Sequence, residues 1–126
     1  MNKTLLILAM FFAPLQTPQP EYSVEVTLDR VSTGTATFAV DRAGAVSGTM
    51  HLETPNIVDA NLSGSVKDRV WTFEFPFTMP QPNCTGTATG KANINADRSL
   101  VEGSLTISGA CAPQTLTGTF TFKKTK

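Results

Sequence analysis

The chain has no net charge, which argues against two common classes of partner. Ten basic residues balance ten acidic ones among 126 residues. Proteins that bind nucleic acid or anionic membrane surfaces usually carry an excess of basic charge, because that charge neutralises phosphate groups. We therefore expect no nucleic-acid partner and no membrane association of the mature form.

Motifs that carry catalysis or bind metals are also missing. The sequence contains no nucleophile elbow, no phosphate-binding loop and no residues with metal-ligand spacing. The one histidine, His51, stands outside any such motif. We therefore expect no cofactor, no metal site and no catalytic residues, and we predict that the protein is not an enzyme.

A long apolar run occurs once, at the start of the chain. Lys3 precedes an apolar stretch over residues 5–12, which is too short to cross a bilayer as a helix. A basic residue followed by a short apolar run is typical of a secretory signal peptide. We predict a signal peptide over residues 1–17, a linker over residues 18–21 and one domain over residues 22–126, in a secreted or periplasmic protein.

Helical periodicity is absent after residue 21. Apolar and polar residues instead alternate with a period of two, which is typical of a β-strand with one buried face. Eight such runs are separated by clusters that carry the turn-forming residues Asp, Gly, Pro or Asn. The predicted strands cover residues 22–28, 34–40, 46–52, 58–66, 70–77, 84–95, 100–111 and 116–122.

An even number of antiparallel strands allows the first and last strands to pair, which removes both exposed edges of the sheet. The sequence therefore predicts an all-β fold, an antiparallel up-and-down eight-stranded β-barrel. A two-sheet β-sandwich is the alternative. The interior of an eight-stranded barrel is just wide enough to be filled by side chains or to hold one small molecule.

The two cysteines allow the strand register to be tested. A turn centred between Asp97 and Arg98 makes residues face each other when their numbers sum to 195. Cys84 and Cys111 meet this condition, so we predict a structural disulfide between them, as a non-hydrogen-bonded strand pair. A disulfide of this kind is typical of an exported protein.

Glycine is concentrated on the apolar face of the predicted strands, where it offers no side chain for packing. Inward glycine permits the sharp bend of a small barrel. It also leaves space inside the barrel. Either a bound ligand or aromatic rings could fill this space, and the candidate rings are those of Trp71, Phe73, Phe75 and Phe77. The inward glycines lie at positions 34, 48, 64, 86, 90, 103, 109 and 118.

The longer connections that contain proline all fall at one end of the predicted barrel. They surround Pro55, the pair Pro80 and Pro82, and Pro113. We place the mouth of any cavity at this end. The candidate ligand-binding residues are inward-facing apolar residues near it, namely Met50, Leu52, Phe75, Phe77 and Leu116.

The predicted interior contains no acid, base or nucleophile. By strand parity His51, Glu74 and Glu102 face water, and the inward polar groups are the Tyr22 hydroxyl and the Trp71 indole. The leading hypothesis is an exported binding module for a small apolar ligand or a protein partner, without catalytic chemistry. The alternative is a structural or surface-interaction protein with a fully packed core and no ligand site.

Overall fold

The computed structural model describes residues 19–81, 83–112 and 114–125. The predicted signal peptide, residues 1–17, lies outside the described residues, and so do Pro82 and Pro113 of the predicted mouth. The first strand begins at Glu21, so that residue belongs to the barrel rather than to the predicted linker. The described residues contain no helix that could cross a membrane.

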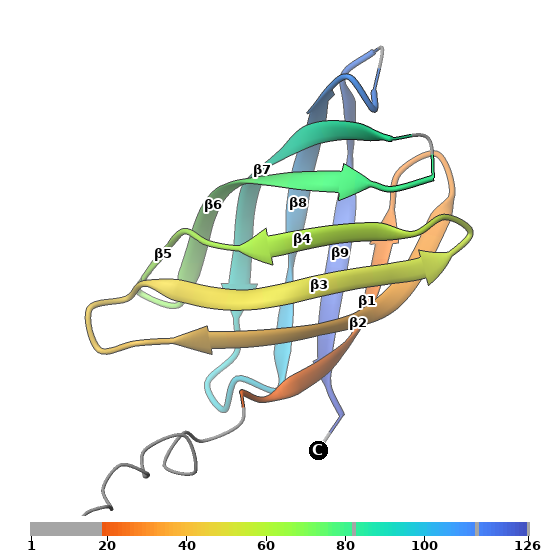
Figure 1. The fold of residues 1–126 in the computed structure, drawn as a ribbon. Coiled ribbons are helices and arrows are strands. Elements are labelled where there is room, and N and C mark those ends of the chain that lie inside the picture. Colours follow the sequence, from red (N-terminus) through yellow and green to blue (C-terminus); the bar gives the residue numbers. More distant parts are fainter. Residues whose placement is uncertain (1–18, 82, 113, 126) are drawn as a thin grey trace, which may run out of the picture.

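The described chain forms one antiparallel sheet that curls into a closed barrel (Figure 1). Strands that pair run in opposite directions, and short turns join most neighbours. Their bounds are β1 (Glu21–Thr27), β2 (Val31–Val40), β3 (Val46–Thr54), β4 (Val58–Leu62), β5 (Ser65–Lys67), β6 (Val70–Met79), β7 (Cys84–Ile94), β8 (Leu100–Gly109) and β9 (Leu116–Lys124).

The barrel closes through two pairings. The first strand, β1, pairs with the last, β9. Both β4 and β5 pair with β6 in one register, in which Ala60 lies opposite Phe77 and Val66 lies opposite Trp71. Together β4 and β5 therefore act as a single barrel strand. The fold is a closed antiparallel eight-stranded barrel, which confirms the predicted class and excludes the sandwich.

The break between β4 and β5 divides the predicted strand over residues 58–66. The shared register places Asn61 opposite Pro76, and proline has no N–H to donate across a strand pair. Close to the break Gly64 adopts a φ of 128°, which side chains rarely allow. One proline and one glycine therefore explain why the residues between Ala60 and Ser65 do not pair with β6. These residues still form part of the barrel wall.

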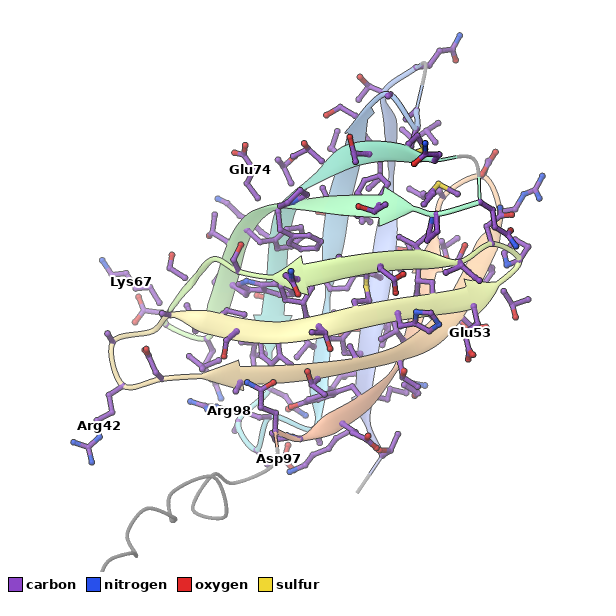
Figure 2. The ribbon with its side chains drawn as sticks, in the orientation of Figure 1. Arg42, Glu53, Lys67, Glu74, Asp97 and Arg98 are labelled. Atoms are coloured by element: carbon purple, nitrogen blue, oxygen red, sulfur yellow. A yellow bond between two sulfur atoms is a disulfide. The ribbon has the colours of Figure 1, made fainter. Side chains whose placement is uncertain are left out.

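Side chains alternate between the interior and solvent along the strands (Figure 2). In β6, for example, Trp71, Phe73 and Phe75 are buried, whereas Glu74 points outward. Burying one such ring stabilises the fold by roughly 1.5–3 kcal/mol. Among the described residues, the one large apolar side chain that is exposed is Val31. The apolar side chains therefore form one core inside the barrel.

Aromatic rings pack directly over inward glycines. A Cβ added at Gly86 would lie 2.5 Å from Cζ of Phe77, and one at Gly90 would lie 2.9 Å from Cζ of Phe73. Both distances are shorter than a carbon contact allows. The predicted filling of glycine volume by rings is therefore observed at these two positions. At Gly34, Gly48, Gly103 and Gly118 the atom nearest to an added Cβ is instead a backbone carbonyl oxygen of the neighbouring strand. Gly109 does not face inward as predicted, because it is exposed and its φ of 107° belongs to a turn at the end of β8.

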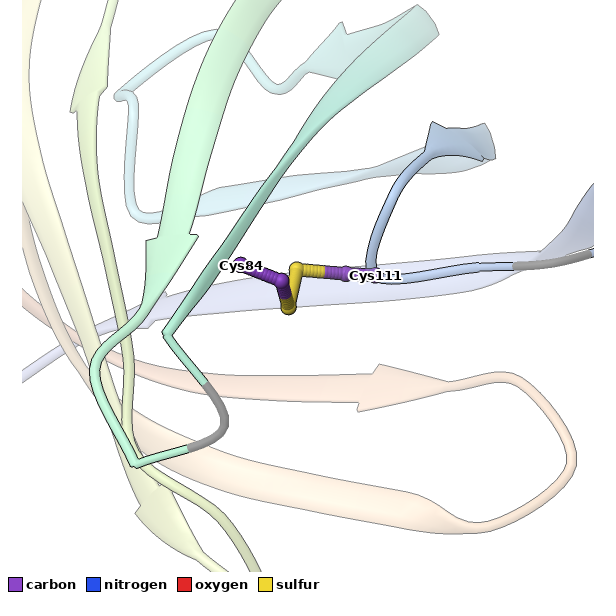
Figure 3. Close-up of a disulfide and its surroundings, with 2 residues drawn as sticks. All are labelled: Cys84 and Cys111. Carbon is purple, nitrogen blue, oxygen red and sulfur yellow. A yellow bond between two sulfur atoms is a disulfide. The ribbon is translucent and has the colours of Figure 1, made fainter.

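The pairing of β7 with β8 has the predicted register, with Ala88 opposite Ile107 and Ile94 opposite Val101. The prediction was wrong about where β8 ends. The strand stops at Gly109, so Cys111 lies in the following turn rather than in a strand pair. Its N–H still donates to the carbonyl oxygen of Thr85 at 3.3 Å. The disulfide between Cys84 and Cys111 is present, with Cα atoms 5.3 Å apart (Figure 3).

Replacing both cysteines by serine should lower the free energy of unfolding by about 2 to 4 kcal/mol, since the crosslink restricts the unfolded chain. Urea unfolding of the double variant beside the wild type measures this difference. The wild type unfolded in the presence of a reductant is the control and should shift by a similar amount. A shift below about 0.5 kcal/mol would mean that the crosslink contributes little to stability.

Gly86→Ala should destabilise the barrel by about 1–3 kcal/mol, because the new methyl group overlaps the Phe77 ring. Combining it with Phe77→Leu should recover part of that loss, since the smaller side chain leaves room for the methyl group. Thermal unfolding of the two single variants and the double variant tests the coupling. Purely additive effects would show that the ring does not occupy the space over the glycine.

Candidate functional site

One end of the barrel contains a cavity of about 360 Å³. It opens at the end where the β1–β2, β3–β4, β6–β7 and β8–β9 connections lie (Figure 1). The predicted mouth is at this same end. The cavity wall includes all five residues that the sequence singled out as candidate ligand-binding residues: Met50, Leu52, Phe75, Phe77 and Leu116. Their role in binding stays a prediction.

The floor of the cavity is a cluster of aromatic rings. The Trp71 ring lies 4.5 Å from that of Phe73 and 5.0 Å from that of Phe38, measured between centroids. Phe120 meets Trp71 edge to face, and Tyr22 packs behind Phe38 toward the far end. Trp71 and Tyr22 are each 1% exposed. The barrel is thus filled at one end and hollow at the other.

The polar atoms of these rings already have hydrogen-bond partners. The Tyr22 hydroxyl donates to the carbonyl oxygen of Arg98 at 2.7 Å, and Nε1 of Trp71 donates to that of Ser63 at 3.0 Å. Burial raises the pKa of Tyr22, so the hydroxyl stays protonated. The described residues leave no buried side-chain polar atom without a partner. The deep wall therefore has no free group with which to bind a polar atom of a ligand.

The mouth differs from the floor in being partly polar. Asp29 and Arg30 reach the cavity from the turn between β1 and β2, Ser32 from the start of β2, and Asn56 from the turn between β3 and β4. These four residues were missed at the sequence level, where only apolar inward positions were considered. The sequence could have indicated them, because all four lie in the predicted connections at the open end of the barrel.

The segment after β8 covers part of the mouth. Ala112 is 6% exposed and lines the cavity together with Cys111. The disulfide fastens this segment to the first residue of β7 (Figure 3). The crosslink therefore holds one side of the entrance in place as well as joining two strands.

The charged side chains of the described strands lie on the outer surface of the barrel. Glu25, Glu74, Lys91 and Glu102 are exposed. The described residues contain no group of three or more His, Cys, Asp or Glu side chains that could hold a metal ion. The described part of the cavity wall combines an apolar interior with a polar rim. Its one acidic and one basic side chain, Asp29 and Arg30, both lie at that rim.

One pair of ionisable side chains on the outer surface is in contact. Nδ1 of His51 donates to the carboxylate of Asp59, which faces it across the β3–β4 pair. This hydrogen bond, more than any other influence, raises the pKa of His51. His51 faces solvent as the strand parity predicts. Its contact with Asp59 was not predicted, because the facing of the two residues depends on the register of the hairpin.

Protein-family models and curated protein sequences give no match to this chain. Two solved structures are similar to it. The structure of EF1p2_mFAP2b bound to DFHBI is 14% identical, with a TM-score of 0.62, and the match covers 84% of this chain and 92% of the other. The redesigned β-barrel mFAP1 bound to DFHBI is 17% identical, with a TM-score of 0.59, covering 84% and 94%. At these identities the likeness shows the closed barrel fold.

Asp59→Asn should lower the pKa of His51, because the replacement removes the carboxylate that stabilises the imidazolium. A raised folded-state pKa stabilises the protein below the unfolded pKa of about 6.5, and this contribution is lost as the pH rises through the folded value. His51 is the only histidine, so one imidazole proton signal reports the titration by NMR. An identical pKa in both proteins would refute the pairing.

Proposed function

We propose that this protein is an exported binding module that holds one small apolar ligand inside its barrel and does not transform it chemically. The observation that carries the proposal is the cavity of about 360 Å³, with an apolar interior and an opening at one end of the barrel. Ligand pockets in proteins span about 300–1,000 Å³ and are mostly apolar, so the cavity falls at the small end of that range.

The size of the cavity suggests the size of the ligand. An apolar cavity of about 150 Å³ is enough to bind one benzene molecule. The space beside Met50, Phe75 and Leu105 is a little over twice as large. A ligand of two or three ring-sized groups, or an alkyl chain of similar volume, matches it.

Two further observations support binding inside the barrel. The similar barrels are described as bound to DFHBI, so barrels of this fold are able to hold a small molecule. On the outer surface, Val31 is the one exposed large apolar side chain within the described residues. Protein interfaces usually bury apolar anchors at their centre, so an internal ligand fits the protein better than a protein partner on the barrel wall.

Export and the absence of catalysis belong to the same proposal. A disulfide persists in oxidising compartments, and the predicted signal peptide over residues 1–17 agrees with that location. Catalysis on a ligand in the barrel needs an acid, a base or a nucleophile within reach. The inner part of the described wall offers hydrocarbon, aromatic and thioether groups, so the protein is suited to carry or sequester its ligand.

The test uses N-phenyl-1-naphthylamine, an uncharged dye whose emission rises in apolar surroundings. The wild type should bind it and quench or shift the emission of Trp71, the single tryptophan, which lies in the cavity floor. Ala88→Phe places a ring in the cavity and should weaken binding by about tenfold or more, equal to about 1.4 kcal/mol.

The matched control is Ser104→Phe, which adds a ring of the same size at an exposed position of β8. It should bind the dye like the wild type. Circular dichroism establishes that both variants are folded. Equal dye binding by the two variants would locate the dye outside the barrel, and no binding by the folded wild type to the dye or to any apolar compound would refute the proposal.

A further inference from the structure

The polar groups of the cavity wall lie at one end only. Asp29, Arg30, Ser32 and Asn56 are at the mouth, and the wall below them is apolar. At the floor, the indole N–H of Trp71 is already bonded to the carbonyl oxygen of Ser63. A ligand's polar group can therefore be hydrogen-bonded at the mouth, but it loses its water without replacement anywhere deeper.

Among the described residues, the cavity wall itself carries one charge of each sign. Arg30 is its one basic residue, and the carboxylate of Asp29 directly precedes it. Glu53 adds a second carboxylate near this end, whereas Arg42 and Lys67 lie at the opposite end of the barrel (Figure 2). An anionic head group attracted by Arg30 is thus repelled by Asp29 and Glu53, and a cationic one attracted by these carboxylates is repelled by Arg30.

Both charged classes of ligand must also give up water on entering. The dehydration of a carboxylate or an ammonium group is compensated only where an opposite charge faces it in good geometry. Asp29 and Arg30 lie side by side at an exposed rim, where solvent screens their attraction for an opposite charge on the ligand. The attraction therefore compensates little of the dehydration cost. An uncharged hydroxyl or carbonyl loses much less water and finds both donors and acceptors at Asn56 and Ser32.

We infer that the ligand is an uncharged compound with one polar end: a hydrocarbon body of about ten to fourteen carbon atoms inside the barrel and a single hydroxyl or carbonyl group at the mouth. The inference rests on the proposed binding function and specifies the chemical class of its ligand. The carbon count follows from comparing the cavity of about 360 Å³ with the smaller cavity that holds benzene.

The test compares four ligands with one ten-carbon chain: 1-decanol, 1,10-decanediol, decanoate and decylammonium. Each displaces N-phenyl-1-naphthylamine from the wild type at neutral pH, below its micellar concentration. We expect 1-decanol to bind most tightly. The diol should bind at least about tenfold more weakly, because its second hydroxyl is buried without a partner. Decanoate and decylammonium should also bind more weakly than the alcohol.

Each outcome separates this inference from the proposed function. A diol that binds as tightly as 1-decanol would overturn the single polar end. Tighter binding of decanoate, lost in Arg30→Gln, would overturn the uncharged head group and identify an anion site at the mouth. In both cases binding inside the barrel would stand. If the wild type binds the dye but none of the four compounds displaces it, the inferred class of ligand is wrong. If the folded wild type binds neither the dye nor any of the four compounds, the binding function itself fails.

Discussion

Closure of the sheet between β1 and β9 is the constraint on which the other features depend. Once eight antiparallel strands join into a ring, the interior has a fixed cross-section, and every inward position contributes to the same space. Alternation of polar and apolar residues then assigns each side chain to that space or to water. Packing, cavity and mouth are all consequences of how the inward positions fill one closed volume.

The inward positions fill that volume unevenly. Trp71, Phe38 and Phe122 converge at one end, where their rings contact each other and leave little space. Toward the other end the inward residues include Met50, Phe77 and Leu116, which line the cavity. Gly86 and Gly90 add no side chain to the interior, and the rings of Phe77 and Phe73 occupy the space beside them. A filled floor and an open mouth result from the same alternation.

The chemistry of the site follows from which groups closure places inside. The Tyr22 hydroxyl and the Trp71 indole reach the interior, and both are bonded to backbone carbonyl oxygens. The ionisable pair His51 and Asp59 lies on the outer surface, away from the cavity. An interior of this kind offers shape and apolar area rather than reactive groups, and hydrogen bonding is left to the rim. Under the proposed function, the length and the single polar end of the ligand are the properties that such an interior recognises.

The sequence by itself determined the strand pattern, the barrel, the register of β7 on β8 and the facing of Cys84 and Cys111, because these depend on a period of two and on short turns, which are local properties. The tertiary structure decided what depends on distant chain segments: the break opposite Pro76, the end of β8 at Gly109, the contact between His51 and Asp59, and the polar rim around Arg30. The cavity belongs to this second group. Its volume is the difference between the space that eight strands enclose and the space that all inward side chains occupy together. The pattern of any one strand is therefore not enough to predict it.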